Sequence, residues 1–317
     1  MLTAFLTTME QMLRILLFLA IGFGMNKLHI LPQGANKGIS KLATTLLLPA
    51  MLLHSNMTEF NLADVGTYSQ IVMLGAVIWA ATTIPSLWIA KRLSAGDPNE
   101  RGVYLYGLCF PNASAVGTPL ALALAGSLGL FQFNLFLLVY VVTTYSWGIN
   151  LFLDEERKNP VKRFFQHLIN PIFLGMLAGL ILGALGAKNW MPGIVMQITE
   201  DLGACFIPLS LLMVGYSVAD YPFGEVFQRR KSYIFTALRL IIIPLVVMLA
   251  LRFANISKEI TTLILFAMAS PCGMNVVVFP AAYGRDCKTG ASIVLMSCLG
   301  SVITMPLLYA ILQVLFA

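Results

Sequence analysis

Charged side chains are scarce in this chain. Asp, Glu, Lys and Arg make up 11% of its 317 residues, whereas hydrophobic residues make up 58%. A soluble domain carries about 25% charged residues. No polar stretch is long enough for a separate soluble domain, so the composition predicts an integral membrane protein over the whole length. Glu10 and Arg14 interrupt the first apolar stretch, which lacks the charged head of a signal peptide, so we expect a retained first helix.

The chain also lacks the residue clusters that hold metals, disulfide frameworks or catalytic groups. Its five cysteines show no CxxC spacing and its three histidines are scattered. We therefore expect no metal site and no cofactor. An integral-membrane enzyme needs clustered carboxylates or a nucleophile with its base, and neither pattern is present. The net charge of +6 is a topology signal in such a chain and does not indicate a nucleic-acid partner.

Apolar stretches of about 20 residues predict membrane-spanning helices. The sequence holds ten such stretches, at 9–27, 40–57, 68–91, 102–126, 130–153, 167–186, 193–217, 232–253, 260–282 and 288–315. The fold class that we expect is therefore an all-α integral membrane protein with ten transmembrane helices.

Basic residues are distributed unevenly over the predicted loops. The loops after the first, third, fifth, seventh and ninth spans hold 15 of the 20 basic residues. The opposite loops hold only Lys188, Arg252 and Lys258. The positive-inside rule makes the first set cytoplasmic, so both termini are expected outside the cytoplasm.

Prolines repeat at a nearly constant offset along the chain. Five of the six prolines in the first half have a partner 159 to 161 residues later. The pairs are Pro32/Pro192, Pro49/Pro208, Pro85/Pro244, Pro111/Pro271 and Pro119/Pro280. This offset divides the chain into repeats 1–153 and 167–317, joined by a cytoplasmic linker at 154–166. An odd number of spans in each repeat inserts the second one upside down, which gives an inverted repeat.

Two proline-bounded runs interrupt the fourth and ninth predicted spans. One extends from Pro111 to Pro119 and the other from Pro271 to Pro280. Each begins ten or eleven residues into its span, about 15 Å deep and close to the membrane midplane. Half-helices that begin at such a break direct unsatisfied N–H groups and a positive dipole end toward each other, which favours an anion there. Two ordinary proline kinks are the structural alternative.

These runs predict a binding site for an anion. The candidate residues are Pro111, Asn112, Ser114, Gly117, Thr118, Pro119, Pro271, Cys272, Gly273 and Asn275.

Four other residues are candidates for charge or proton coupling: Arg239, His54, Glu10 and Asp201. Arg239 lies eight residues past Lys231, about 12 Å inside its span, where an ionisable group is a functional candidate. Each has a structural alternative. Arg239 could snorkel to the interface, and Glu10 could pair with Arg14. His54 could make a structural hydrogen bond, and Asp201 could compensate the helix dipole.

At these residues the chain resembles the auxin efflux carrier family. Pro111-Asn112 with Gly117 and Pro119 is similar to the crossover motif of that family's fourth helix. Pro271 and Gly273, followed by Val278-Phe279, are similar to its ninth-helix crossover. Further similarities are Pro49 with His54, Arg239 with Pro244, Asn170-Pro171, and Thr304 with Pro306.

The resemblance implies an architecture and a transport mechanism. In it the first, second, sixth and seventh spans form a scaffold, and spans three to five and eight to ten form a moving transport domain. The family also implies homodimers through the scaffold and elevator-like alternating access for organic anions. The short linker and Cys272, which stands where the plant proteins carry a glutamine, fit a prokaryotic carboxylate carrier in the inner membrane better than an auxin exporter.

The sequence as a whole predicts a secondary transporter of small organic carboxylates in the plasma membrane. The alternative is a cation-coupled symporter or antiporter of the same inverted-repeat architecture, similar to bile-acid/sodium symporters. An antiporter should carry carboxylates at the midplane, and the two interrupted spans have none near their breaks. Transport coupled to H⁺, to Na⁺ or to neither stays open.

Overall fold

The computed structural model describes residues 2–32, 34–152, 170–219, 227–282, 285 and 287–316. The predicted linker at 154–166 and the first residues of the predicted span 167–186 lie outside this part of the chain. The described residues are helical apart from turns and contain no strand, only an isolated antiparallel bridge between Pro111 and Cys272. The predicted all-helical class is confirmed.

The first half of the described chain holds six α-helices with four short π or 3₁₀ segments. In chain order they are α1 (Leu2–Lys27), α2 (Ala35–Leu42), η1 (Ala43–Leu47), α3 (Leu48–Glu59), η2 (Leu62–Asp64), α4 (Val65–Leu93), α5 (Pro98–Cys109), η3 (Ala113–Gly117), α6 (Thr118–Ser146) and η4 (Gly148–Phe152). Non-helical backbone at Gly126 divides α6, which matches the predicted boundary between spans 102–126 and 130–153.

The second half holds eight described α-helices. They are α8 (Pro171–Ala184), α9 (Gly193–Ala204), α10 (Phe206–Val218), α12 (Arg230–Ala237), α13 (Ile243–Phe253), α14 (Lys258–Met268), α15 (Asn275–Ala282) and α16 (Lys288–Leu315), with η6 (Ala187–Asn189) and η7 (Leu238–Ile242) between them.

Six helical segments in the described part of the chain are long and apolar enough to cross a membrane. They are Leu6–Lys27, Leu62–Leu93, Ala113–Phe152, Gly193–Val218, Arg230–Phe253 and Lys288–Leu315. The pieces α5, α14 and α15 are too short to span alone, because each ends or begins at an interruption and a span needs about 20 residues.

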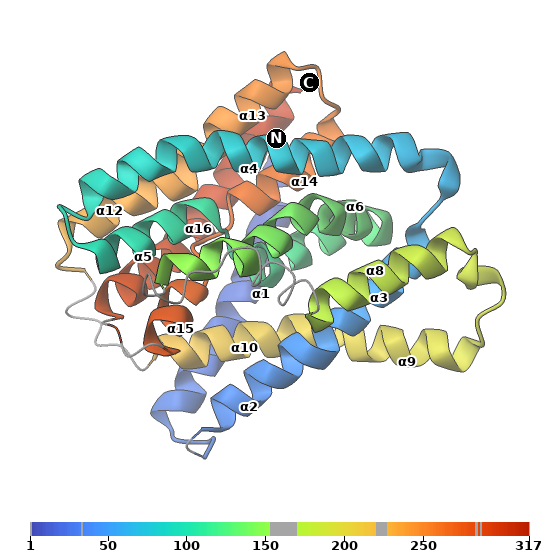
Figure 1. Cartoon of the computed structure of the whole chain (residues 1–317), viewed down its shortest axis with the longest axis horizontal. Coiled ribbons are helices and arrows are strands. Elements are labelled where there is room, and N and C mark those ends of the chain that lie inside the picture. The colour runs from blue at the N-terminus through green and yellow to red at the C-terminus, as the bar shows by residue number, and fades with distance from the viewer. Residues whose placement is uncertain are drawn as a thin grey trace.

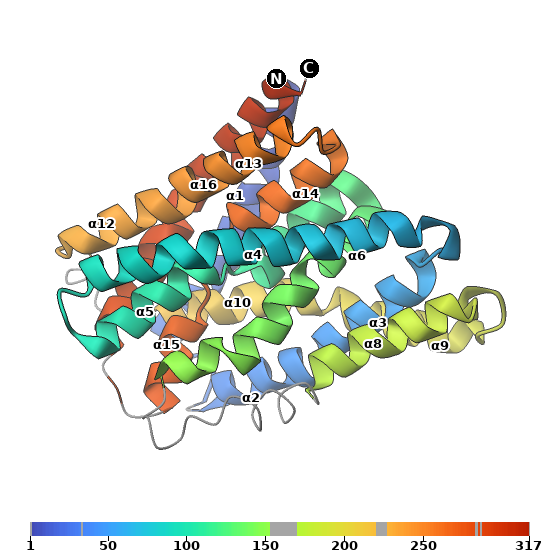
Figure 2. The same ribbon diagram turned by 45° about the horizontal axis from the view of Figure 1, so that its top comes forward.

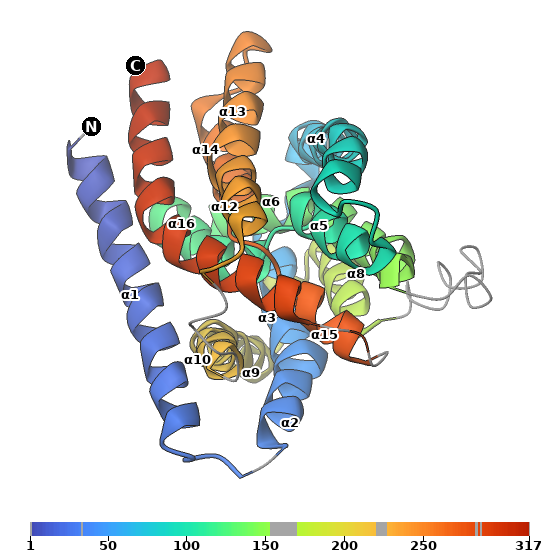
Figure 3. The same ribbon diagram turned by 90° about the vertical axis from the view of Figure 1, so that its left-hand side faces the viewer.

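The helices form two groups that lie beside each other (Figures 1 and 3). In one group α3 packs on α8 and α9, and α10 packs on α1. In the other, α4 packs on α5 and α6, while α14 lies against α6 and α13. Helix α1 also packs along α16, so it contacts both groups.

Glycines allow the first group to pack closely. Gly175, Gly179 and Gly183 recur every fourth residue on α8, and a β-carbon at any of them would collide with the backbone of α3 or its extension at Phe60. Helix packing in membranes relies on such small residues because lipid removes the hydrophobic drive for helices to associate.

Three π turns each precede a proline. They are η1, η3 and η7, followed by Pro49, Pro119 and Pro244 at the start of α3, α6 and α13. Proline lacks an N–H and its ring clashes with the carbonyl four residues earlier, so a widened turn relieves the clash without ending the helix. Of these three sites, only the run from Pro111 to Pro119 was predicted from the sequence to be interrupted, and its π form was not predicted.

The two chain ends lie close together at one end of the molecule, where α1 begins and α16 ends (Figure 2).

Candidate functional site

The two interrupted helices meet at their breaks. Helix α5 ends at Cys109 and η3 begins at Ala113, while α14 ends at Met268 and α15 begins at Asn275. Between them the Asn112 N–H donates to the Pro271 carbonyl at 2.8 Å, next to the bridge of Pro111 with Cys272. The interruptions leave backbone N–H and carbonyl groups without helical partners, and here a donor of one break pairs with an acceptor of the other. Buried non-helical backbone requires such pairing.

The asparagine of the first break has a side chain without a partner. Asn112 immediately precedes η3 but its side chain caps no backbone N–H. Its Nδ2 is buried and donates no hydrogen bond to any described residue. An unsatisfied buried donor costs about 1–3 kcal/mol, so this amide is suited to a ligand that accepts a hydrogen bond.

The asparagine of the second break is already engaged. Asn275 begins α15, and its Nδ2 donates to the hydroxyl of Tyr106 at 2.8 Å. The Tyr106 ring packs on Phe110 at 4.6 Å between ring centroids and on Phe279 at 5.7 Å. Tyr106 therefore ties the start of α15 to α5.

A cavity of about 510 Å³ lies beside the crossing of the two breaks. One wall comes from α5, η3, α6 and α15, and the facing wall from α2, η1, α3, α8 and α10. Its polar lining residues are Ser40, Lys41, Thr44, Tyr106, Asn112, Ser114, Tyr140, Thr144, Ser210, Ser217 and Asn275. None of the described residues around it is acidic, so the cavity suits a ligand that accepts hydrogen bonds or carries negative charge.

Half of the predicted binding residues line this cavity, namely Pro111, Asn112, Ser114, Gly273 and Asn275. The other half do not line it: Gly117, Thr118, Pro119, Pro271 and Cys272. At Gly117 a β-carbon would lie 2.6 Å from the Phe133 ring and 3.2 Å from the Phe266 carbonyl oxygen. The backbone N–H of fully buried Cys272 donates to Ser297 Oγ at 3.0 Å.

Several lining residues were not predicted from the sequence. Tyr106 lies four residues before Phe110 on a helix whose last turns are almost entirely apolar, so its position alone gave no signal. Ser40, Lys41 and Thr44 lie at the start of a predicted span and read as the cytoplasmic end of a membrane helix. Only the packing of α2 toward α10 brings them to the cavity.

Arg239 is fully buried in the π turn η7 and does not line the cavity. None of its three guanidinium nitrogens has a hydrogen-bond partner among the described residues. The side chains within its electrostatic reach are Cys272 of the crossing, Tyr140 of the cavity wall and Cys109 at the end of α5. Arg239 therefore lies near the crossing but is not among the residues that line the cavity.

The other three candidates for coupling lie apart from the cavity. His54 is half-buried and its Nδ1 lies 3.1 Å from Thr199 Oγ1, which joins α3 to α9. Glu10 on α1 and Asp201 on α9 are exposed. Arg14, the expected partner of Glu10, instead donates to Gln11 Oε1 at 3.3 Å. The structure does not bring these residues together.

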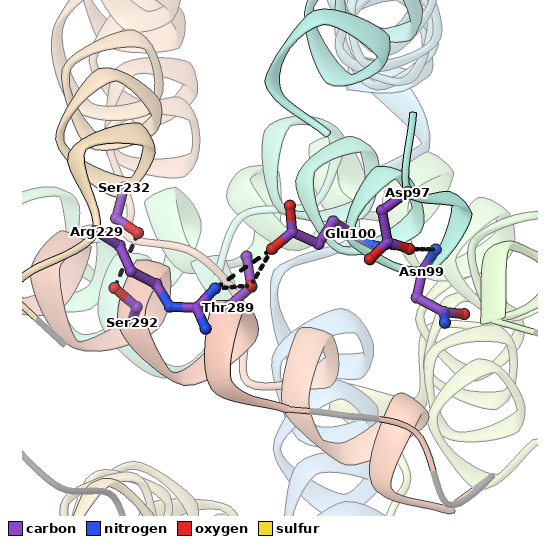
Figure 4. A network of polar contacts seen from close by, with 7 residues as sticks. All are labelled: Asp97, Asn99, Glu100, Arg229, Ser232, Thr289 and Ser292. Carbon is purple, nitrogen blue, oxygen red and sulfur yellow. Dashed lines mark hydrogen bonds and ion pairs between the residues drawn. The ribbon is translucent and has the colours of Figure 1, made fainter. Parts of the chain in front are cut away.

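A polar network joins the starts of three helices from the two halves of the chain (Figure 4). Arg229 Nη1 lies 3.3 Å from Glu100 Oε1 and 2.6 Å from Thr289 Oγ1, and Thr289 donates to Glu100 at 2.9 Å. Nearby, Ser292 Oγ donates to Ser232 Oγ at 2.8 Å. The network fixes the first turn of α5 against α12 and α16. The described residues hold no group of three or more His, Cys, Asp or Glu that could bind a metal.

These features define a helical membrane protein with a cavity at two broken helices, and comparison with known proteins agrees. The family model described as "Membrane transport protein" matches residues 7–309. The chain belongs to this family, that of the auxin efflux carriers, so the resemblance seen in the sequence is confirmed. It is also 31% identical over 110 residues to Protein ECM3 of Saccharomyces cerevisiae; that match covers 34% of this chain but only 17% of the yeast protein.

Proposed function

We propose that this membrane transport protein carries small organic anions with a carboxylate group, which bind where the two broken helices cross. The observation that carries the proposal is the unpartnered, buried amide of Asn112 at a cavity without described acidic residues. A carboxylate accepts hydrogen bonds from such an amide and is favoured by the starts of η3 and α15 beside it.

Arg239 supports this proposal through its charge and not through contact. A buried guanidinium without a counter-ion costs several kcal/mol, so the fold keeps it at the expense of stability. Because it lies near Cys272 and Tyr140, its charge adds to that of the two helix starts at the cavity. It does not hold a carboxylate partner among the described residues.

The arrangement also supports ten spans in two inverted five-helix repeats, 1–153 and 167–317. The spans consist of α1, α2–η1–α3, α4, α5 with the start of α6, the rest of α6, α8, α9–α10, α12–η7–α13, α14–α15 and α16. The two chain ends on one side of the molecule fit an even number of crossings with both termini outside the cytoplasm.

The two groups of helices favour alternating access by an elevator-like movement. The cavity lies between them, so sliding one wall past the other would carry a ligand held at Asn112. In the orientation predicted by the loop charges, Lys41 and Ser217 lie toward the cytoplasm, so this state opens inward. A homodimer through the scaffold helices is part of this proposal.

Uptake into proteoliposomes tests the proposed function. The probes are labelled malonate and benzoate, a dianion and a monoanion of small size. We expect wild-type protein to take up at least one of them faster than empty vesicles, and Asn112→Ala to lower uptake at subsaturating concentration by about tenfold or more. Asn134→Ala is the matched control, because its amide is also buried and unpartnered but lies away from the cavity. Equal uptake by Asn112→Ala and wild type would overturn the assignment.

A further inference from the structure

Lys41 is the one charged side chain among the described residues that line the cavity. It lies at the end of α2 on the wall that faces Asn112, and its side chain is exposed. The cavity therefore reaches the surface beside an ammonium group.

The position of Lys41 is fixed by the packing of α2 on α10. Asn36 Nδ2 donates to Ser217 Oγ at 2.9 Å, and Ser40 Oγ donates to Asn36 Oδ1 at 3.4 Å. The Lys41 carbonyl accepts from Thr45 Oγ1 at 2.8 Å, where α2 continues into η1. This polar chain holds the start of the span against α10 and places Lys41 at the rim of the cavity.

The neighbouring lysines have different surroundings. Lys27 Nζ donates to the Ala219 carbonyl at 2.9 Å, where α10 ends, so its ammonium is engaged. Lys37 lies one turn before Lys41 on α2 and is exposed, but it does not line the cavity. No described carboxylate pairs with Lys41. All three fit the positive-inside rule, but Lys41 alone combines an unpaired charge with the cavity.

A charge at the mouth of a narrow site acts more strongly than the same charge on an open surface. Low-dielectric walls focus the field into the opening and raise the local concentration of ions of opposite sign, by tenfold or more in favourable cases. Such an effect changes association more than the strength of the final complex, and salt weakens it.

We propose that Lys41 recruits organic anions to the cavity and excludes cations from it, before the ligand reaches Asn112. This rests on the proposed function for the identity of the ligand, but the charge selectivity of the cavity is measurable without any substrate. In this proposal Lys41 selects the ions that enter the cavity, and the crossing of the two breaks binds the carboxylate.

Cysteine modification measures this selectivity directly. Ser210→Cys places a thiol in the cavity wall of α10, in a background with the two cysteines that are not buried replaced, Cys205→Ser and Cys287→Ser. The probes are the anionic sulfonatoethyl and the cationic trimethylammonioethyl methanethiosulfonate. We expect Lys41→Gln to lower the anion-to-cation ratio of modification rates by about fivefold at low ionic strength and by less than about twofold in molar salt.

Lys37→Gln is the matched control and should leave the ratio within about twofold of the parent. The same ratio in Lys41→Gln as in the parent, or an equal fall in Lys37→Gln, would overturn the role of Lys41. Malonate or benzoate uptake by Asn112→Ala separates this result from the proposed function. If Asn112→Ala takes up the acid normally and Lys41→Gln shifts the modification ratio, only the crossing site is rejected. If Asn112→Ala loses uptake and Lys41→Gln leaves the ratio unchanged, only the role of Lys41 is rejected.

Discussion

The two breaks of the chain resemble each other in sequence but use their polar groups differently. In the first, the Asn112 backbone N–H pairs with the opposite break while its side chain stays unpartnered. In the second, the Asn275 side chain donates to the Tyr106 hydroxyl, and the Cys272 backbone N–H donates to Ser297 Oγ. One break therefore keeps a donor available and the other uses its polar groups to hold the crossing together.

The glycines of the two breaks differ in the same way. Gly117 is enclosed by Phe133, Ser270 and the backbone of α14, whereas a β-carbon at Gly273 would meet only ordinary contacts, the nearest 3.5 Å away at the Phe110 carbonyl. The first break is therefore tightly packed at Gly117, whereas the second has room at Gly273 beside the cavity.

Alanine substitution at these two glycines should give the largest difference in stability. Gly117→Ala overpacks a buried contact and should cost about 1–3 kcal/mol, which lowers the melting midpoint of purified protein by roughly 2–8 °C. Gly273→Ala should change the midpoint by less than about 1 °C because its β-carbon has space. Equal midpoints for the two variants would contradict the asymmetry. The measurement is thermal unfolding in detergent, followed by tryptophan fluorescence.

Arg239 offers a test in which stability and binding move in opposite directions. Arg239→Met removes an unpartnered buried charge, so the protein should unfold at the same or a higher temperature. At a separation of about 11 Å, taken for this estimate, a unit charge contributes about 1.5 kcal/mol at an effective dielectric of about 20, so anion binding should weaken roughly tenfold. Arg239→Lys should bind anions between these limits because it retains a charge of different shape.

Calorimetric binding and thermal unfolding of the same preparations decide between the two readings of Arg239. A less stable Arg239→Met protein with unchanged anion affinity would make the arginine a structural residue.

The smallest effect concerns the first turns of the two half-helices. Glu100 of α5 and Glu259 of α14 occupy corresponding places, but Glu100 contacts Arg229 and Thr289 while Glu259 is exposed. Glu100→Gln should cost about 1 kcal/mol, because it weakens a partly exposed ion pair and its hydrogen bond. Glu259→Gln should cost a few tenths of a kcal/mol, the contribution of a helix-start charge. A larger loss at Glu259 in chemical unfolding would mean that the network of Figure 4 does not stabilise the fold.

The helical class and the two breaks could be predicted from hydropathy and proline positions. The breaks at Pro111 and Pro271 were predicted because proline removes an N–H and hydropathy marks the surrounding span. The sequence could not predict which candidates line the cavity. Cys272 and Gly273 are adjacent, yet Cys272 is buried in the packing and Gly273 lines the cavity. Tyr106, Lys41 and Ser210 became visible only through contacts between helices distant in the sequence.

The short helical pieces show a second limit of sequence patterns. Proline signals an interruption but not its form: Pro119 follows a π turn, whereas its partner Pro280 lies inside α15 and Pro85 lies inside a continuous α4. Local backbone geometry depends on what neighbouring helices offer to the freed carbonyls, and that information is tertiary.

The most direct test of the central claim compares the two asparagines in one binding experiment. Malonate and benzoate are titrated by calorimetry into wild type, Asn112→Ala and Asn275→Ala, using whichever acid the wild type binds. Of these two asparagines, Asn112 has an unpartnered amide and Asn275 donates to Tyr106. We therefore expect Asn112→Ala to weaken binding about 10- to 150-fold and Asn275→Ala to weaken it less than about fivefold. Equal losses in both variants, or an unchanged affinity in Asn112→Ala, would contradict the account.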